Sequence, residues 1–210
     1  MGDTTGHGFQ DVPTTTLADQ LGREQIMDIG IRPLWNAPRL AGPAYTVHCP
    51  KGDNLMLHAA IHRAGPGSVI VVESGDLDYA LAGGNVCAVA QRRGVAGFVL
   101  DGLIRDLGEV RELGFPVFAR GVIPKPGAKN EIAPLGGPVR CGGATVHAGD
   151  TVVADEEGVV VVPAAQAAQT LAQALRKLAA EQAEGLDVWE SEHRARVAKL
   201  LAERGFRDGA

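Results

Sequence analysis

The chain of 210 residues contains no apolar run of roughly eighteen residues or more, so no segment predicts a transmembrane helix. Its three cysteines, Cys49, Cys87 and Cys141, are widely spaced and form no CxxC pair, which argues against a disulfide framework or a zinc knuckle. The formal net charge is −5, so the electrostatic footprint of a nucleic-acid-binding protein is missing. We therefore expect buried thiols, no direct binding to nucleic acid and no membrane partner.

The first sixteen residues, MGDTTGHGFQDVPTTT, are polar and lack the apolar core of a signal peptide. We expect this stretch to be a flexible lead-in and the protein to be cytoplasmic. A glycine-rich nucleotide loop between a strand and a helix is also missing, which gives no support to a nucleotide-dependent enzyme such as a methyltransferase.

Short apolar runs alternate with helical patterns through the first half of the chain, which predicts an α/β fold. The expected strands lie at 44–49, 68–73, 95–100 and 116–119, and the expected helices at 16–22, 54–64, 79–93 and 107–113. Further β segments separated by turn residues, at 139–140, 144–146, 151–154 and 159–162, predict a second and more antiparallel sheet layer. The sequence predicts one domain over residues 1–163 and a helical arm over residues 164–210.

Charged side chains follow the apolar strand that we expect to end at Asp101-Gly102. Arg105, Asp106 and Glu109 come next, in the region beyond the carboxyl end of the strand where ligands bind in sheets of this kind. A purely structural interpretation also fits: Asp106 and Glu109 resemble a capping box, and Arg105 with Glu109 could form a surface ion pair on the helix. The local pattern leaves both interpretations open.

The wider sequence favours chemistry at this position. The blocks that carry the signal are IRPLWNAPRLAGPAYTV, KGDNLMLHAA, PGSVIVVESG, RGVAGFVLDGLIRD, LGFPVFARGVIP and GDTVVADEEGVVVVP. In this order they resemble the family that joins the class II 4-hydroxy-4-methyl-2-oxoglutarate/4-carboxy-4-hydroxy-2-oxoadipate aldolases to the regulator of ribonuclease E activity A (RraA). The enzymatic signature of that family is Asp or Gly, twenty residues, then Arg-Asp, and the glycine version adds a nearby acidic residue. Gly84, Arg105, Asp106 and Glu109 fit the glycine version.

The resemblance implies a swivelling-type β/β/α sandwich with a helical C-terminal arm. It also implies homotrimers or homohexamers of single-domain subunits, with active sites in clefts between subunits. The arm at 164–210 would then be free to pack on a neighbouring subunit. The implied partner is a small oxo-acid substrate.

The implied activity is that of a divalent-metal-dependent lyase. It would cleave 4-hydroxy-4-methyl-2-oxoglutarate or 4-carboxy-4-hydroxy-2-oxoadipate to release pyruvate by a retro-aldol reaction, and would also decarboxylate oxaloacetate. Bond cleavage beside a ketone leaves an enolate, whose negative charge Mg²⁺ or Mn²⁺ stabilises. Asp106 is the expected direct metal ligand. Glu109 is expected to replace an acid missing at position 84, by reaching the metal through water or by orienting a water that acts as base.

Substrate-binding residues follow from the same resemblance. Arg105 is expected to hold the substrate carboxylate and keto oxygen through its planar guanidinium. Gly84 is followed by Asn85, Val86 and Cys87 at the start of a helix, whose free amides are expected to bind the pyruvyl carboxylate. Many family members carry an acidic residue and two leucines here, so Gly84-Asn85-Val86 departs from the usual pattern.

Two other functions remain open. The protein could be a non-catalytic regulator that binds ribonuclease E or an RNA helicase through its acidic surface, or an α/β trimer that binds a different oxo acid. The complete set of Arg105, Asp106 and Glu109 favours the lyase.

Other acidic and histidine residues carry weaker signals. His58 and His62 lie four residues apart on a predicted helix, but no zincin glutamate and no third ligand accompany them, so packing or hydrogen bonding is the favoured interpretation. Residues 155–158 predict a hairpin turn. Family enzymes bring a glutamate from the adjoining subunit toward the site, but Glu190 and Glu192 in the arm are left outside the predicted site.

Overall fold

The computed structural model describes residues 8–36 and 39–207. The strands of its main sheet are β1 (Arg32–Pro33), β2 (Leu40–Cys49), β3 (Val69–Ser74), β4 (Ala80–Ala82), β5 (Gly97–Ile104), β6 (Val117–Val122), β9 (Thr151–Asp155) and β10 (Gly158–Val162). The helices are α1 (Thr14–Ala18), α2 (Leu55–Ala60), α3 (Gly84–Arg92), α4 (Leu107–Leu113), α5 (Ala167–Ala183) and α6 (Leu186–Glu203), with short 3₁₀ turns η1 (Arg23–Gln25) and η2 (Ala164–Gln166).

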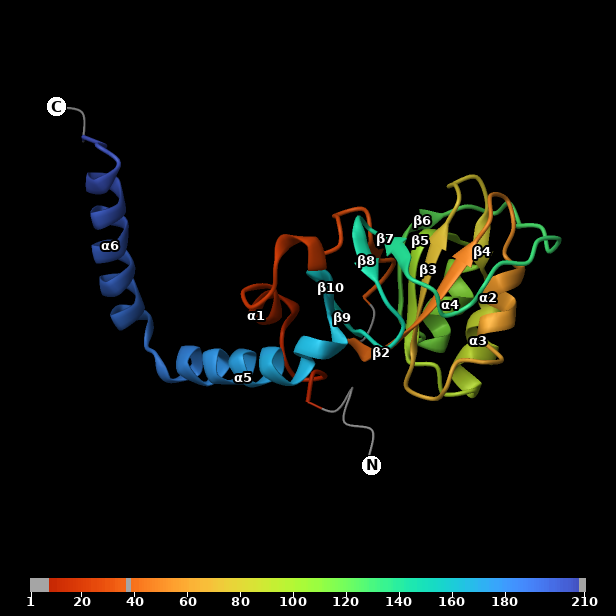
Figure 1. Cartoon of the computed structure of the whole chain (residues 1–210), viewed down its shortest axis with the longest axis horizontal. Coiled ribbons are helices and arrows are strands. Elements are labelled where there is room, and N and C mark those ends of the chain that lie inside the picture. The colour runs from red at the N-terminus through yellow and green to blue at the C-terminus, as the bar shows by residue number, and fades with distance from the viewer. Residues whose placement is uncertain (1–7, 37–38, 208–210) are drawn as a thin grey trace. The chain divides into compact units, whose positions relative to one another are not determined.

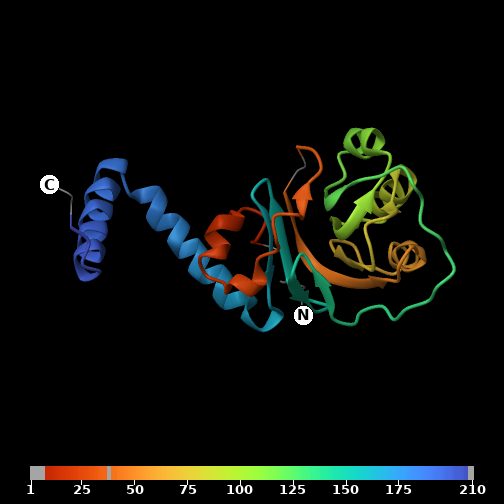
Figure 2. The ribbon, with the colours of Figure 1, turned by 90° about the horizontal axis from the view of Figure 1, so that it is seen from above.

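The main sheet has the order β1-β6-β5-β3-β2-β9-β10, with β4 beside β5. Strands β2, β3, β5 and β6 run parallel, whereas β1, β9 and β10 pair antiparallel with their neighbours. Because β1 also contacts β10, the sheet curls into a nearly closed barrel (Figures 1 and 2). The α/β prediction is thus confirmed at the level of a mixed, barrel-like sheet with C-terminal helices.

The predicted second sheet layer is wrong in part. Strands β9 and β10 extend the main sheet through β2, and only β7 (Val139–Cys141) and β8 (Ala144–Val146) form a separate antiparallel pair. The difference arises because β2 begins at Leu40 rather than at residue 44. Its first residues, including Gly42 and Pro43, pair with β9.

Alternate residues of the strands face different cores, as the two-residue period of a strand requires. Val71 of β3 packs with Val99 of β5 inside the barrel, next to β7 and β8. Ile70 and Val72 point the other way, into a core covered by α2, α3 and α4 (Figure 1). This second core fixes the helices whose ends form the candidate site.

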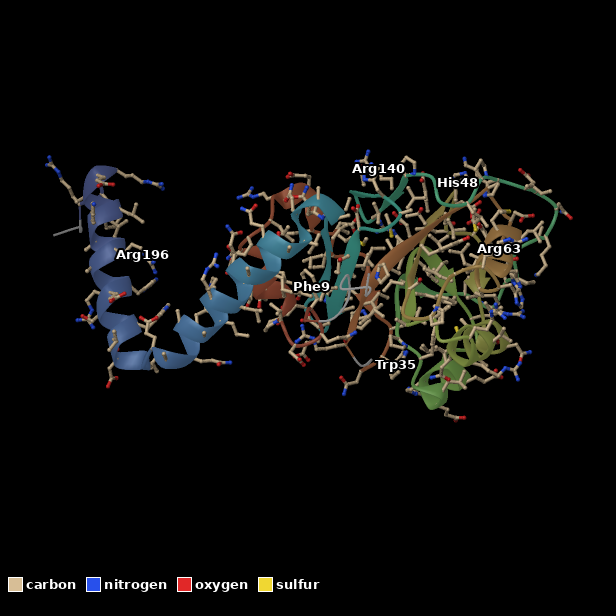
Figure 3. All side chains as sticks on the ribbon, turned by 60° about the horizontal axis from the view of Figure 1, so that its bottom comes forward. Phe9, Trp35, His48, Arg63, Arg140 and Arg196 are labelled. Carbon is tan, nitrogen blue, oxygen red and sulfur yellow. The ribbon has the colours of Figure 1, made fainter. Side chains whose placement is uncertain are left out.

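A third cluster joins the N-terminal segment to β9, β10 and α5. Phe9, labelled in Figure 3, is only 2 % exposed, and Val12 is fully buried in the same cluster. The prediction of a flexible lead-in is therefore wrong for its described part, because these apolar side chains anchor it and α1 already begins at Thr14. The first seven residues of that lead-in lie outside the described residues.

Two further boundaries differ from prediction. The helix expected from residue 79 is preceded by strand β4, and α3 begins only at Gly84. Strand β5 continues through Asp101 and Gly102 to Ile104. Asp101 does not end the strand because distant groups satisfy its carboxylate: the Arg120 guanidinium bonds one oxygen, and the Gly142 N–H donates to the other at 2.8 Å.

The chain divides into two compact units between Ala174 and Leu175. The first holds the sheet, its covering helices and the start of α5. The second holds the rest of α5 and α6, and Glu190 and Glu192 lie exposed on α6. None of the helices within residues 8–36 and 39–207 combines the length and hydrophobicity that a bilayer-spanning segment requires.

Arg120 links the barrel to the segment before β1. Besides Asp101, it binds both oxygens of Asp28, at 3.0 and 2.9 Å, and its side chain is 23 % exposed. We expect Arg120→Met to lower the free energy of unfolding by about 2 kcal/mol at pH 7, because it leaves two carboxylates without their cation. Urea unfolding measures this, with the exposed Arg111→Met as the matched control.

The pH dependence of this effect has a defined sign. The hydrogen bond from Arg120 lowers the pKa of Asp28 below its ordinary value of 3.8. A depressed carboxyl pKa stabilises the folded state above the ordinary value, and the contribution is lost as the pH falls through the lowered pKa. The difference between the native protein and Arg120→Met should therefore shrink below about pH 4, and a difference that grows with acid would contradict the role given to Asp28.

Candidate active site

Arg105 and Asp106 form the turn between β5 and α4, two elements that the core holds in place. Asp106 has φ 56° and ψ 38°, in the left-handed region, and it is the only non-glycine residue with positive φ in the described part of the chain. Aspartate and asparagine tolerate this conformation better than other side chains with a Cβ. The turn directs the Asp106 carboxylate toward α3 instead of along α4.

The Asp106 carboxylate binds the start of α3. Its Oδ2 accepts the N–H of Gly84 at 3.2 Å and lies 3.5 Å from Nε of Arg105. Gly83 permits this approach, because a Cβ there would overlap Oδ2. The capping-box interpretation is wrong for Asp106, since its side chain makes no capping bond to α4. Its Oδ1 has no hydrogen-bond partner among the described residues.

Glu109 reaches the same helix from one turn farther along α4. Its Oε2 occupies the space into which a Cβ on residue 84 would project. No ion pair joins Arg105 to Glu109 among the described residues, so that structural interpretation is wrong as well. Glycine at position 84 thus leaves room for the Glu109 carboxylate, and the structure brings Gly84, Asp106 and Glu109 together as the family resemblance implies.

The amides at the start of α3 are only partly free. The N–H of Gly84 is taken by Asp106, and the N–H of Cys87 donates to Gly83 O at 3.1 Å as the first bond of the helix. Cys87 is also fully buried, and burial raises the pKa of its thiol to about 12. The prediction that the Cys87 N–H binds the substrate is therefore wrong. Among the described N–H groups in the first turn of α3, those of Asn85 and Val86 have no partner.

A cavity of ≈ 70 Å³ lies at this junction. It is lined by Asn54, His58, Ala80, Leu81, Ala82, Gly83, Asn85, Val86, Arg105, Asp106, Pro126 and Lys129. Four of these were predicted site residues, namely Asn85, Val86, Arg105 and Asp106. Glu109 lines a neighbouring surface groove with Gly84, Asn85 and Ala88 instead.

Sequence reasoning missed Asn54 and Lys129, and it gave His58 only a structural role. No local motif marks these residues, because long-range bonds place them. The Asn54 amide nitrogen donates to Ala80 O at 3.2 Å and to Leu81 O at 3.1 Å, which fixes the start of α2 against β4.

The loop that carries Lys129 is tied to the same point. The backbone N–H of Asn54 donates to Ala128 O at 2.9 Å. The buried Asp53 carboxylate accepts N–H groups from Asn130 and Glu131 at 2.5 and 3.2 Å. Lys129 therefore reaches the cavity because its neighbours on both sides are bonded to residues 53 and 54.

The cavity is electropositive on one side. Burial is the largest cause that lowers the pKa of His58 below its ordinary value, and the charges of Lys129, His62 and Arg105 lower it further. The imidazole is therefore neutral at pH 7, whereas Arg105 and Lys129 carry positive charge. A cavity with this lining favours a small anion.

The donors present suit a hard, hydrated cation rather than zinc. No cluster of three or more histidine, cysteine or acidic side chains occurs within residues 8–36 and 39–207, so His58 and His62 do not complete a metal site. Mg²⁺ commonly keeps several waters and needs only one or two protein carboxylates. The unpaired Oδ1 of Asp106 and the adjacent Glu109 meet that requirement.

Comparisons with known proteins show the family to which this chain is related. A family model described as "RraA-like: Aldolase/RraA" matches residues 14–161. A protein of Halalkalibacterium halodurans named "Putative 4-hydroxy-4-methyl-2-oxoglutarate aldolase" is 39 % identical over 176 residues, which cover 83 % of this chain and 84 % of that protein.

Solved structures extend the similarity to RraA proteins. A member of the RNase ES inhibitor RraA family from Streptomyces coelicolor, described as unusual, superposes with a TM-score of 0.75 at 30 % identity, covering 93 % of this chain and 100 % of that chain. The RNA-processing inhibitor RraA from Thermus thermophilis gives a TM-score of 0.67 at 30 % identity, covering 73 % and 93 %.

Proposed function

Because the chain belongs to the RraA-like family, which includes both aldolases and RraA proteins, we propose that it is a divalent-metal-dependent lyase that releases pyruvate. Its proposed substrates are 4-hydroxy-2-oxo acids such as 4-hydroxy-4-methyl-2-oxoglutarate or 4-carboxy-4-hydroxy-2-oxoadipate. One observation carries the proposal: Arg105, Asp106, Asn85 and Val86 line a single cavity.

Each of these groups has a defined role toward a 2-oxo acid. The Arg105 guanidinium binds the keto oxygen and one carboxylate oxygen, and it keeps its charge throughout the reaction. The amides of Asn85 and Val86 bind the other carboxylate oxygen at the positive end of α3. Lys129 adds a second cation to the cavity lining, which favours a substrate with more than one carboxylate.

Asp106 would hold Mg²⁺ or Mn²⁺ directly, and Glu109 would reach the ion through a water molecule. The bound ion would supply a Lewis acid for the charge that develops on the ketone oxygen. Decarboxylation of oxaloacetate leaves the same pyruvate enolate, so we propose that the one site performs both reactions.

The assembly proposed for this lyase is a trimer or hexamer with the active site between subunits. The part of the predicted arm from Leu175 onward would pack on a neighbouring copy, because residues up to Ala174 belong to the first unit. Light scattering on the purified protein measures the oligomeric state, and a monomer that is fully active would contradict this part of the proposal.

A regulatory role is the second candidate, because an RNA-processing inhibitor RraA and an unusual member of the RNase ES inhibitor RraA family share the fold at 30 % identity. A pyruvate assay coupled to lactate dehydrogenase distinguishes the two functions. If the protein is a lyase, it should release pyruvate in the presence of Mg²⁺, and EDTA should abolish this release. Inhibition of ribonuclease E at comparable protein concentration, without any pyruvate, would favour the regulator.

Glu109 and Gly84 allow a matched test of the second carboxylate. We expect Glu109→Ala to lower kcat by about 10- to 100-fold, because the ion loses an outer partner. Adding Gly84→Asp should restore most of that loss, since a side chain on residue 84 projects into the space that Glu109 vacates. Gly84→Asp alone should impair activity through overlap with Glu109.

The control is Glu112→Ala, which removes an exposed acid from the same groove and should leave kcat unchanged. Thermal melting accompanies each assay. If Glu109→Ala lowers stability in proportion to activity, or if the double variant gains nothing over it, Glu109 supports the helix rather than the reaction.

A further inference from the structure

Retro-aldol cleavage requires a base that removes the proton of the substrate hydroxyl. Among the described residues that line the cavity, one neutral side chain can act as this base. Glu109 faces the neighbouring groove and is not among the cavity residues. Asp106 is assigned to the ion, and Arg105 and Lys129 are assigned to the substrate carboxylates. We propose that His58 is the general base that removes the proton from the hydroxyl of the 4-hydroxy-2-oxo acid, an inference that rests on the proposed function.

The position of His58 follows from how α2 is anchored. Its backbone N–H donates to Asn54 O at 3.2 Å, so His58 lies one turn after the residue that is bonded to β4. Both side chains therefore line the cavity wall that also includes Lys129. His62, one more turn along, is exposed and does not line the cavity.

The surroundings keep the imidazole in the form that a base requires. Burial is the largest cause that lowers its pKa; Lys129 and Arg105 from other elements and His62 from the turn after α2 lower it further, while Asp53 acts in the opposite direction. A base whose pKa lies below the working pH is mostly deprotonated and can accept a proton. The cations that depress this pKa are also placed to hold the substrate carboxylates.

The reaction is balanced in protons and electrons without another reactant. The His58 imidazole takes the hydroxyl proton, the O–H pair forms the new carbonyl, and the C3–C4 bond breaks. Its electron pair passes into the pyruvyl fragment, which leaves as an enolate beside Arg105. The resulting imidazolium returns its proton to C3 of the enolate, which gives pyruvate and regenerates neutral His58.

Two substrates separate this role from a structural one. Oxaloacetate has no hydroxyl to deprotonate, so its decarboxylation needs no base. In His58→Gln we expect kcat for 4-hydroxy-4-methyl-2-oxoglutarate to fall about 100-fold, while oxaloacetate turnover stays within about twofold of the native value. His62→Gln, an exposed histidine in the turn after α2, is the matched control and should change neither reaction.

Two further readouts would not respond to a merely structural histidine. In the native protein, kcat/KM for the aldol substrate should fall about tenfold per pH unit below the pKa of His58, and this acidic limb should disappear in His58→Gln. Imidazole added to His58→Ala should raise the aldol rate without raising the oxaloacetate rate.

The possible failures are distinguishable. Equal loss of both reactions in His58→Gln, or no rescue of His58→Ala by imidazole, overturns the assignment of His58 and leaves the lyase intact. If the native protein releases pyruvate from neither substrate, the proposed function and the assignment that rests on it are both overturned.

Discussion

Asp106→Asn is expected to lower kcat for pyruvate release by about 1,000-fold, because the substitution removes the charge that holds the cation while keeping the shape of the side chain. Asparagine is at least as tolerant of the left-handed conformation at this position as aspartate is. Its amide oxygen can still accept the N–H of Gly84, which donates to Asp106 at 3.2 Å in the native protein. The fold should therefore survive.

Mn²⁺ binding measured by calorimetry accompanies the kinetic assay, because loss of the ion should be visible without substrate. Asp78→Asn, which removes an exposed carboxylate elsewhere, should leave both metal affinity and kcat unchanged. Excess Mg²⁺ should restore native turnover after EDTA treatment but not after Asp106→Asn. A variant that retains native kcat with unchanged Mn²⁺ affinity would show that the cation is held elsewhere.

The sequence predicts the centre of this site because the relevant signals are local. Helix α4 begins and ends where the pattern predicts, at Leu107 and Leu113. Asp106, in the left-handed conformation, precedes it and Gly114 follows it. That Gly84 and Arg105 meet is what the family resemblance implies, and the parallel strands β4 and β5 account for it by bringing both segments to one end of the sheet.

The rest depends on contacts between residues far apart in the chain. Asp101 resembles a strand terminator until Arg120 and Gly142 are seen to satisfy its carboxylate. His58 and Lys129 enter the cavity only because residues 53 and 54 are bonded to other segments, which no helical period or turn motif specifies. Such long-range pairing is the part of a fold that single-sequence patterns do not encode.

The second large effect is expected at Arg105. Arg105→Ala should lower kcat/KM for both proposed substrates by about 1,000-fold, because the residue binds the keto oxygen in the ground state and the enolate charge as it develops. Arg105→Lys keeps the charge but loses the two parallel donors, so its loss should be smaller, about 30- to 100-fold. A kcat/KM that decreases from the native protein to Arg105→Lys and further to Arg105→Ala would distinguish bidentate binding from simple charge attraction.

The position of Arg105 allows its effect on activity to be separated from an effect on stability. Its side chain is 45 % exposed and its Nε lies 3.5 Å from Asp106 Oδ2, so truncation leaves no buried charge behind. Arg111→Ala on the same helix as Glu109 is exposed, outside the cavity, and should have no effect. Pyruvate binding, measured as product inhibition, should weaken in parallel with kcat/KM. If Arg105→Ala leaves product inhibition unchanged, the guanidinium does not bind the oxo acid, because the reactant and the product share the same pyruvyl group.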